Sequence, residues 1–150
     1  MRVLRGGLAV LAAVWMDAAG AQMPSARLET GGVAIEVEVA VGSADRELGL
    51  MYRSRLAPDR GMVFVFPADT RLCMWMRNTL IPLSVAFLDG EGRILNIEEM
   101  TPQTDDSHCA RAPARYALEM NRGWFRAHGV QAGEVVGGVK SLPGEASAPK

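Results

Sequence analysis

The chain has little of what metal and redox sites need, and no long apolar run. Its 150 residues include two cysteines and two histidines, whereas a zinc site needs three or four ligands at workable spacing. The two cysteines do not form a C-x-x-C arrangement, which would lower the pKa of a thiol. No stretch reaches the ~20 apolar residues needed to span a bilayer. The sequence therefore predicts no metal site, no cofactor and no membrane association of the mature chain.

An excess of one charge is also missing. Lysine and arginine together number 16, aspartate and glutamate 17, and the net charge is −1. Such a balance supplies no broad cationic face for nucleic acid or anionic lipid. A glycine-rich phosphate loop and a G-x-S-x-G elbow are absent as well. We therefore expect no nucleic-acid partner, and no enzyme class follows from a motif.

The first 21 residues have the order of a secretory signal peptide. Arg2 and Arg5 give a positive start, residues 8–16 are uncharged and largely apolar, and residues 19–21 read AGA. Small side chains at the first and last of those three positions are what a signal peptidase reads. The sequence predicts cleavage after Ala21 and export, to the periplasm if the source is a Gram-negative bacterium.

The remaining chain reads as a short leader at residues 22–26, one β domain at 27–140 and a disordered tail at 141–150. Residues 33–41 alternate apolar and polar, which is typical of a half-buried strand. Gly31 and Gly32 before them predict a hairpin turn. A short helix is expected from an N-cap at Ser43, with Ala44, Leu48 and Met51 on its apolar face. Many short strands with one or two short helices predict a mainly β fold, a single-domain β-sandwich or jelly-roll-like barrel.

The two cysteines are expected to pair. In an oxidising compartment two cysteines in a small domain usually form a disulfide, here Cys73–Cys109. A redox-active pair is the weaker alternative, because the residues are far apart in sequence. Residues 72–76 are expected to be extended, which puts Trp75 and Met76 on opposite faces.

Nine methionines raise a copper hypothesis, because thioethers are soft ligands suited to Cu(I). Met74 and Met76 would share a face, with His108 as a possible partner. Methionine is also a flexible core filler, and core packing is the preferred interpretation. The methionines that fall on apolar faces are Met51, Met62, Met74, Met76 and Met120.

Three ordered motifs resemble a known family. They read GLMYR at residues 49–53 followed by GMVF at 61–64, then MWMRNTLIPL at 74–83, and finally YALEM at 116–120 with Gly123. This set is similar to the signature of the domain-of-unknown-function family DUF192, over residues 27–138. The resemblance implies a compact β-sandwich of jelly-roll type and no established activity. Many members carry aspartate where this chain has Ser84, so a mechanism that needs an acid there does not transfer.

Five polar residues adjoin these motifs and are the candidate ligand-binding residues. They are Glu47, Arg53, Arg77, Asn78 and Thr79. A structural alternative is that Asn78 and Thr79 satisfy backbone groups at a bend and that Arg53 caps a helix. The functional hypothesis places Arg53 and Asn78 in one cleft, where a guanidinium suits a carboxylate or phosphate.

Three functions remain open from the sequence. The first is a non-catalytic binding domain for a small anionic ligand or a peptide segment. The second is an envelope enzyme with Glu47 or a loop aspartate as general base. The third is a copper or redox accessory protein. The sequence leans away from an enzyme and does not determine the oligomeric state.

Overall fold

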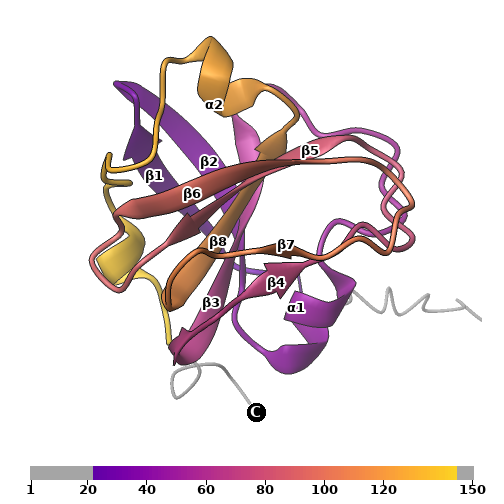
Figure 1. Ribbon diagram of the computed structural model, residues 1–150, viewed down its shortest axis with the longest axis horizontal. Helices are drawn as coiled ribbons and strands as arrows, with labels where there is room; N and C mark the ends of the chain where they lie inside the picture. Colours follow the sequence, from indigo (N-terminus) through magenta and orange to yellow (C-terminus); the bar gives the residue numbers. More distant parts are fainter. Residues whose placement is uncertain (1–21, 145–150) are drawn as a thin grey trace, which may run out of the picture.

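A computed structural model describes residues 22–144 (Figure 1). The expected signal peptide and the last six residues of the expected tail lie outside that range. The strands are β1 Ser25–Thr30, β2 Val33–Ala40, β3 Arg60–Thr70, β4 Cys73–Met74, β5 Leu83–Leu88, β6 Ile94–Met100, β7 His108–Cys109 and β8 Ala114–Asn121. The helices are α1 Ser43–Leu48, α2 Trp124–Ala127 and a 3-10 turn at Val139–Ser141.

Six strands form one twisted sheet in the order β1-β2-β3-β8-β5-β6, and β4 pairs with β7 in a second, two-stranded sheet. All neighbours in the large sheet are antiparallel except β2 and β3. Single bridges join Glu29 of β1 to Gly137 and Arg93, just before β6, to Val135. One C-terminal segment thus touches both edges of the sheet, which does not close into a barrel. The prediction of a mainly β, single-domain fold with two short helices is confirmed.

The N-terminal hairpin forms where the sequence predicts it. Thr30 and Val33 are paired across the turn, and Gly31 and Gly32 have φ values of 60° and 73°. Glycine occupies that left-handed region without the penalty that a Cβ brings. The alternating residues Ile35, Val37 and Val39 are buried on one face of β2. Period-2 patterning was therefore sufficient to orient this strand.

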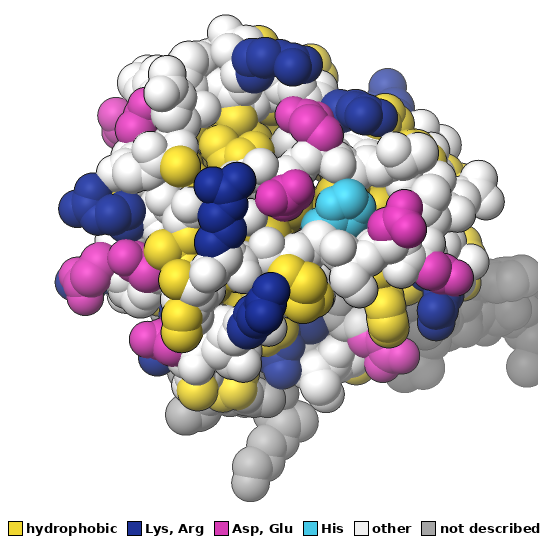
Figure 2. All heavy atoms as spheres, viewed as in Figure 1, with side chains coloured by type: hydrophobic (Ala, Val, Ile, Leu, Met, Phe, Trp, Pro, Cys, Tyr) yellow, Lys and Arg dark blue, Asp and Glu magenta, His cyan; other side chains and the backbone are white. Residues whose placement is uncertain are grey.

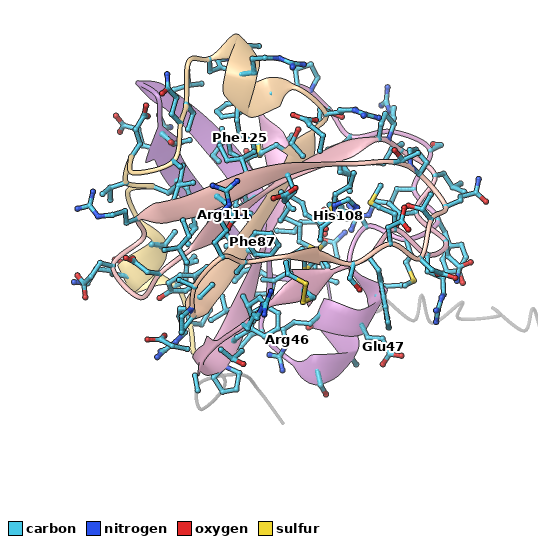
Figure 3. The ribbon with its side chains drawn as sticks, viewed as in Figure 1. Arg46, Glu47, Phe87, His108, Arg111 and Phe125 are labelled. Atoms are coloured by element: carbon cyan, nitrogen blue, oxygen red, sulfur yellow. A yellow bond between two sulfur atoms is a disulfide. The ribbon has the colours of Figure 1, made fainter. Side chains whose placement is uncertain are left out.

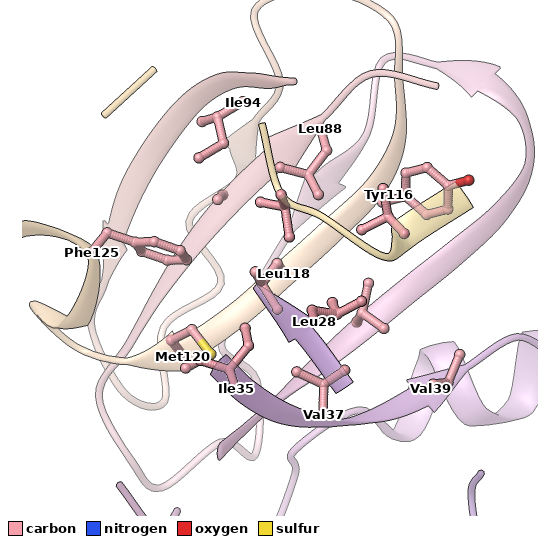
Figure 4. Packing of buried hydrophobic residues seen from close by; sticks show 14 of the residues in the cluster. Leu28, Ile35, Val37, Val39, Leu88, Ile94, Tyr116, Leu118, Met120 and Phe125 are labelled. Atoms are coloured by element: carbon pink, nitrogen blue, oxygen red, sulfur yellow. The ribbon is translucent and has the colours of Figure 1, made fainter. Parts of the chain in front are cut away.

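The centre of the large sheet is buried on both faces. The first face, on the side of α2, holds a core to which β2, β8, α2 and the C-terminal segment contribute (Figure 4). The second face, on the side of α1 and β4, holds another core that includes Met62, Phe64, Val85 and Phe87. Because β8 lies between β3 and β5 in the middle of the sheet, the side chains of residues 116–120 are enclosed on both faces. A polar residue in this part of β8 therefore has no face that opens to water.

A disulfide joins β4 to β7, as predicted. Cys73 and Cys109 are direct cross-strand partners with their Cα atoms 4.0 Å apart. β4 is shorter than expected, but the predicted alternation continues beyond it. Leu72 and Met76 are buried and Trp75 is exposed, so Trp75 and Met76 do lie on opposite sides of this segment. The disulfide fixes the small sheet beside α1 (Figure 1).

The two ends of the domain extend slightly past the expected boundaries. β1 begins at Ser25, two residues before the expected domain start, and the 3-10 turn reaches Ser141. Within residues 22–144, no helix has the length and apolar character that a membrane crossing requires.

Candidate binding groove between α1 and β4

A groove runs between α1 with the turn after it and the segment that follows β4. It comprises two hollows of about 450 Å³ and 260 Å³. The residues that line the larger are Ala44, Glu47, Leu48, Met51, Tyr52, Trp75, Arg77 and Asn78. The smaller is lined by Arg46, Glu47, Phe64, Phe66, Cys73, Met74 and Trp75. Glu47 and Trp75 line both, so we treat the two as one site, the α1–β4 groove.

The helical wall of this groove arises because α1 buries none of its residues. The predicted apolar face of Ala44, Leu48 and Met51 lines the groove instead of the core. The N-cap is Gly42 and not Ser43, and no side chain caps the helix. Gly49 ends α1 at φ 48°, where an added Cβ would lie 3.2 Å from the ring of Phe64. A side chain here would be strained by the positive φ and would require the Phe64 ring to shift by a few tenths of an ångström. The next residue, Leu50, is buried in the core.

The opposite wall is held by the disulfide and by Trp75. The indole ring carries the guanidinium of Arg77 at 4.7 Å from its centroid, a cation–π contact. Nε of Arg77 also donates a 2.9 Å hydrogen bond to Asp105. The amide of Tyr52 donates to the carbonyl oxygen of Asn78 at 2.9 Å, which ties the two walls together at one end. These contacts hold the outer rim of the groove in place.

Below the groove lies a chamber of about 30 Å³, with Glu119 in its lining. The other residues that line the chamber are Arg46, Glu47, Leu48, Gly49, Leu50, Met51, Phe64, Met74, Trp75 and Thr79. Glu119 is on β8, facing the second core, with Met62 and Val85 as its cross-strand neighbours. Only 4% of it is exposed, and within residues 22–144 its carboxyl has no hydrogen bond or ion pair. It is thus a buried acid without a protein partner at the base of an open groove.

Burial changes the protonation of this acid. Desolvation raises the pKa of Glu119 to about 8, because a carboxylate loses hydration that no protein group replaces. At neutral pH the side chain is therefore mostly the neutral acid, which offers one O–H donor and one carbonyl acceptor. A strongly shifted carboxyl in a cleft is a recognised mark of functional sites.

Four of the five predicted site residues lie at this groove. Glu47, Arg77 and Asn78 line its walls, and Thr79 lines the chamber beside Glu119. The Thr79 hydroxyl donates a 3.3 Å bond to the carbonyl of Arg77, and the backbone of Asn78 has φ 55°. Arg46 and Glu47 both project from α1 (Figure 3). The structure thus brings the four predicted residues together at one groove. Their role in binding stays a prediction.

Arg53 does not share the cleft with Asn78. Its guanidinium makes a bidentate contact with Glu38, and it lies in a separate hollow of about 190 Å³. The hydrogen bond from Arg53 lowers the pKa of Glu38 below its usual value. The sequence places Arg53 one residue from Tyr52 but does not show that the strand β2 offers it a carboxylate. The guanidinium of Arg53 is therefore already paired with a carboxylate of the protein.

Glu119 was not among the residues predicted from the sequence. Tyr116, Leu118 and Met120 alternate with Ala117 and Glu119, and a glutamate suits the wet face of a half-buried strand. The available signal was that YALEM is apolar at four of its five positions, which is typical of a strand buried on both sides. In that setting an acid is exceptional, since isolated carboxylates are rarely buried.

Ser84 has a structural environment. It is fully buried on β5, donates a 2.8 Å hydrogen bond to Glu99 and accepts one of 2.8 Å from the amide of Gly123. These bonds tie β5 to β6 and to the residue before α2. The hydroxyl thus has both a donor and an acceptor satisfied inside the fold.

Three of the five methionines that were expected to fill the core do so, whereas Met51 lines the groove. Met120 belongs to the first core, and Met62 and Met76 belong to the second. Met74 is only partly buried and lies directly across from His108 in the small sheet. Among residues 22–144, no three histidine, cysteine, aspartate or glutamate side chains group as metal ligands.

Another hollow, of about 530 Å³, lies elsewhere in the described part of the chain. It lies over β1, β2 and the turn before β3, and it is open. Its lining includes the exposed ion pair of Arg60 with Glu36, 2.8 Å apart. Since it lacks a buried polar group without a partner, we give it less weight than the α1–β4 groove.

Comparisons with known proteins place the chain among relatives of undetermined activity. A protein-family model described as "Uncharacterized ACR" matches residues 26–138. A crystal structure of a "putative transcription regulator" from Sinorhizobium meliloti 1021 superposes with a TM-score of 0.73 at 35% identity, covering 78% of this chain and 95% of that one. A protein of unknown function from Novosphingobium aromaticivorans DSM 12444 gives 0.73 at 30% identity, covering 76% and 85%. None of the curated proteins compared with the chain matches it.

Proposed function

This chain belongs to the DUF192 family, and we propose that it is a non-catalytic binding domain that holds a small ligand in the α1–β4 groove. The observation that carries the proposal is the unpartnered carboxyl of Glu119 at the base of a groove with apolar walls. Small-molecule sites combine apolar lining with a few convergent polar groups in this way. The combined hollows fall within the usual size range of such sites, ~300–1,000 Å³.

The charges of the groove give little support to an anionic ligand. Arg53 is paired with Glu38, and Arg77 donates to Asp105. The other charged residues on the groove are Arg46, whose guanidinium donates to backbone carbonyls of Val41 and Val65, and Glu47. An anion bound here would have to displace one of these contacts. A neutral or cationic ligand would not.

Leu48 provides the test of the groove itself. Truncation by Leu48→Ala should weaken binding of any ligand found in a thermal-shift screen of amines, alcohols, carboxylates and copper ions by about fivefold. A half-exposed leucine that a ligand covers contributes ~1 kcal/mol through apolar area removed from water. Isothermal titration of each hit measures the change.

Leu80→Ala is the matched control. The two leucines are nearly equally exposed, at 47% and 46%, but Leu80 is absent from the lining of the groove. Affinity should be unchanged in this variant. Equal losses in both variants, or none in Leu48→Ala, would rule out the groove as the binding site.

The same carboxyl favours a second candidate, an enzyme with Glu119 as general acid. A carboxyl whose pKa lies near 8 is poised to exchange a proton at neutral pH. Such an enzyme also needs a second reacting group, and the chamber offers Glu47 and the hydroxyl of Thr79. Turnover of a bound compound that Glu119→Gln abolishes while binding persists would favour the enzyme.

Copper remains a third arm of the screen. Met74 and His108 are opposite each other in the small sheet, and directly opposed residues on paired strands lie close together. A stabilisation by Cu(I) that Met74→Leu removes would support the accessory-protein alternative.

Export to an oxidising compartment is part of the proposal. The Cys73–Cys109 disulfide supports it, because such bonds persist in the periplasm and outside cells and are rare in the cytosol. The net charge of −1 gives no support for nucleic-acid binding by this chain, and both signs of charge are interspersed over the face seen in Figure 2.

We expect the exported protein to begin at Gln22. Residues 19–21, AGA, carry the small side chains that a signal peptidase requires. Intact-mass spectrometry of protein recovered from the periplasm of an expressing Gram-negative host tests the expectation. A mass that corresponds to a chain starting at Met1 would contradict it.

A further inference from the structure

We propose that the ligand of the α1–β4 groove is a small primary alkylamine, whose ammonium group enters the chamber at Glu119 while its apolar stem lies along the groove. The inference rests on the proposed binding function and names the ligand class of that same site. It follows from the size of the chamber, the groups that face it and the nature of the walls.

The size of the chamber selects the head group. Its volume of about 30 Å³ accommodates a group about as large as one water molecule. An ammonium or a hydroxyl is of that size. A carboxylate or a phosphate has three or more heavy atoms and fits a space of that size less well.

The charges around the chamber select between an ammonium and a hydroxyl. Besides Glu119, the titratable residues in its lining are Arg46 and Glu47, both from α1. The strands beside Glu119 contribute Met62 and Val85, which carry no charge.

Arg46 is engaged by groups other than the acid. It donates to the carbonyls of Val41 and Val65 and lies over the ring of Phe66. The chamber is therefore lined by Glu119, Glu47 and Thr79, whose side chains carry two carboxyls and one hydroxyl as possible acceptors. An ammonium has three donors and no acceptor, which matches this set.

The walls select the stem. Leu48 and Met51 on one side and Met74 and Trp75 on the other bound the space above the chamber. A short hydrocarbon chain would remove apolar area of these residues from water. The face of Trp75 already holds one cation, the guanidinium of Arg77, so the aromatic wall also tolerates positive charge.

Binding must be coupled to a proton. The empty acid is mostly neutral at pH 7, since its pKa is about 8. An ammonium pairs with the ionised form of the carboxyl. When the complex forms, Glu119 releases its proton to solvent and the ligand remains protonated. With a pKa near 8, about 0.9 proton should be released per amine bound at pH 7, and affinity should rise about tenfold per pH unit between pH 6 and 7.5.

Calorimetric titration of the mature protein with n-hexylamine tests the proposal, with 1-hexanol, hexanoate and Nα-acetyl-lysine methylamide as comparison probes. Runs at pH 6 and 7.5, in two buffers that differ in ionisation enthalpy, give the affinity and the number of protons released. We expect hexylamine to bind at least tenfold more tightly than hexanol and hexanoate, with proton release. Tighter binding of the lysine derivative than of hexylamine would overturn the assignment to a small free amine.

Glu119→Gln should lose at least tenfold in hexylamine affinity and all of the proton release. Glu29→Gln makes the same substitution at an exposed site of β1 and should change neither. Glutamine has nearly the shape of the neutral acid, so the variant should fold, and its circular dichroism spectrum checks this. An amine affinity that does not depend on pH or on Glu119 would overturn the inference.

The proposed function can survive that failure. If hexanol or another screened compound binds in a manner sensitive to Leu48→Ala, the groove is a binding site and only the amine assignment is wrong. If no probe or screened compound binds in the groove, both are wrong.

Discussion

Glu119→Gln should raise the free energy of unfolding by about 4 kcal/mol at pH 8 and by only about 1 kcal/mol at pH 5. The carboxyl titrates at about 8 in the folded protein, against an ordinary value of 4.5. Between these values the folded state keeps a proton that the unfolded state has released, so the stability of the wild-type protein falls as pH rises and levels off above pH 8. A difference of ~3.5 pKa units at ~1.4 kcal/mol each corresponds to a total loss of about 5 kcal/mol.

Urea unfolding at pH 5, 6.5 and 8 measures this effect, because glutamine cannot ionise and removes the decline. Glu29→Gln is again the control, since Glu29 is exposed at the edge of the sheet. It should follow the wild-type curve at all three values. Parallel curves for the wild type and Glu119→Gln would show that the buried acid ionises at its ordinary pKa.

Cys73→Ser combined with Cys109→Ser should lower the free energy of unfolding by about 3–4 kcal/mol. The disulfide closes a loop with a sequence separation of 36 residues, and a cross-link of that span removes conformational entropy from the unfolded chain. A loss of that size is a large share of the total stability of a small domain, about 5–15 kcal/mol. Guanidinium unfolding of the two proteins gives the difference.

The same double variant should weaken ligand binding, because Cys73 and Met74 line the wall of the groove and the bond holds β4 to β7. Wild-type protein treated with a reductant is the matched comparison and should behave like the variant in both measurements. If both retain the unfolding free energy of the oxidised protein to within about 1 kcal/mol, the loop is ordered by other contacts and this prediction is wrong.

The strand patterns that the sequence displayed openly were predictable. Period-2 alternation oriented β2, and the two glycines at 31 and 32 predicted the hairpin. The disulfide followed from the presence of two cysteines in a chain expected to reach an oxidising compartment. In each case a local rule sufficed, because the side-chain period of a strand or the positive φ of a turn is set by adjacent residues. The motifs at residues 49–53, 61–64 and 74–83 also identified the family, which the match over residues 26–138 confirms.

The site was only partly predictable. Glu47, Arg77, Asn78 and Thr79 meet at the groove, as their proximity to the apolar motifs suggested. Arg53 does not, because its partner Glu38 comes from a strand 15 residues earlier. The pairing of α1 with the segment after β4 is a long-range contact, and no local pattern encodes it. The apolar face of α1 looked like a core face for the same reason.

The sequence by itself determined the local structure of this protein: strand faces, turns, the disulfide and the family. Only the tertiary structure decided that β8 is the central strand between β3 and β5, and thereby that Glu119 is buried. The physical reason is that the environment of a side chain depends on which strands and helices cover it, and those arrive from distant parts of the chain. A glutamate in an alternating strand is a solvated surface group at a sheet face open to water, but under α1 and β4 it becomes a desolvated acid at the base of a groove.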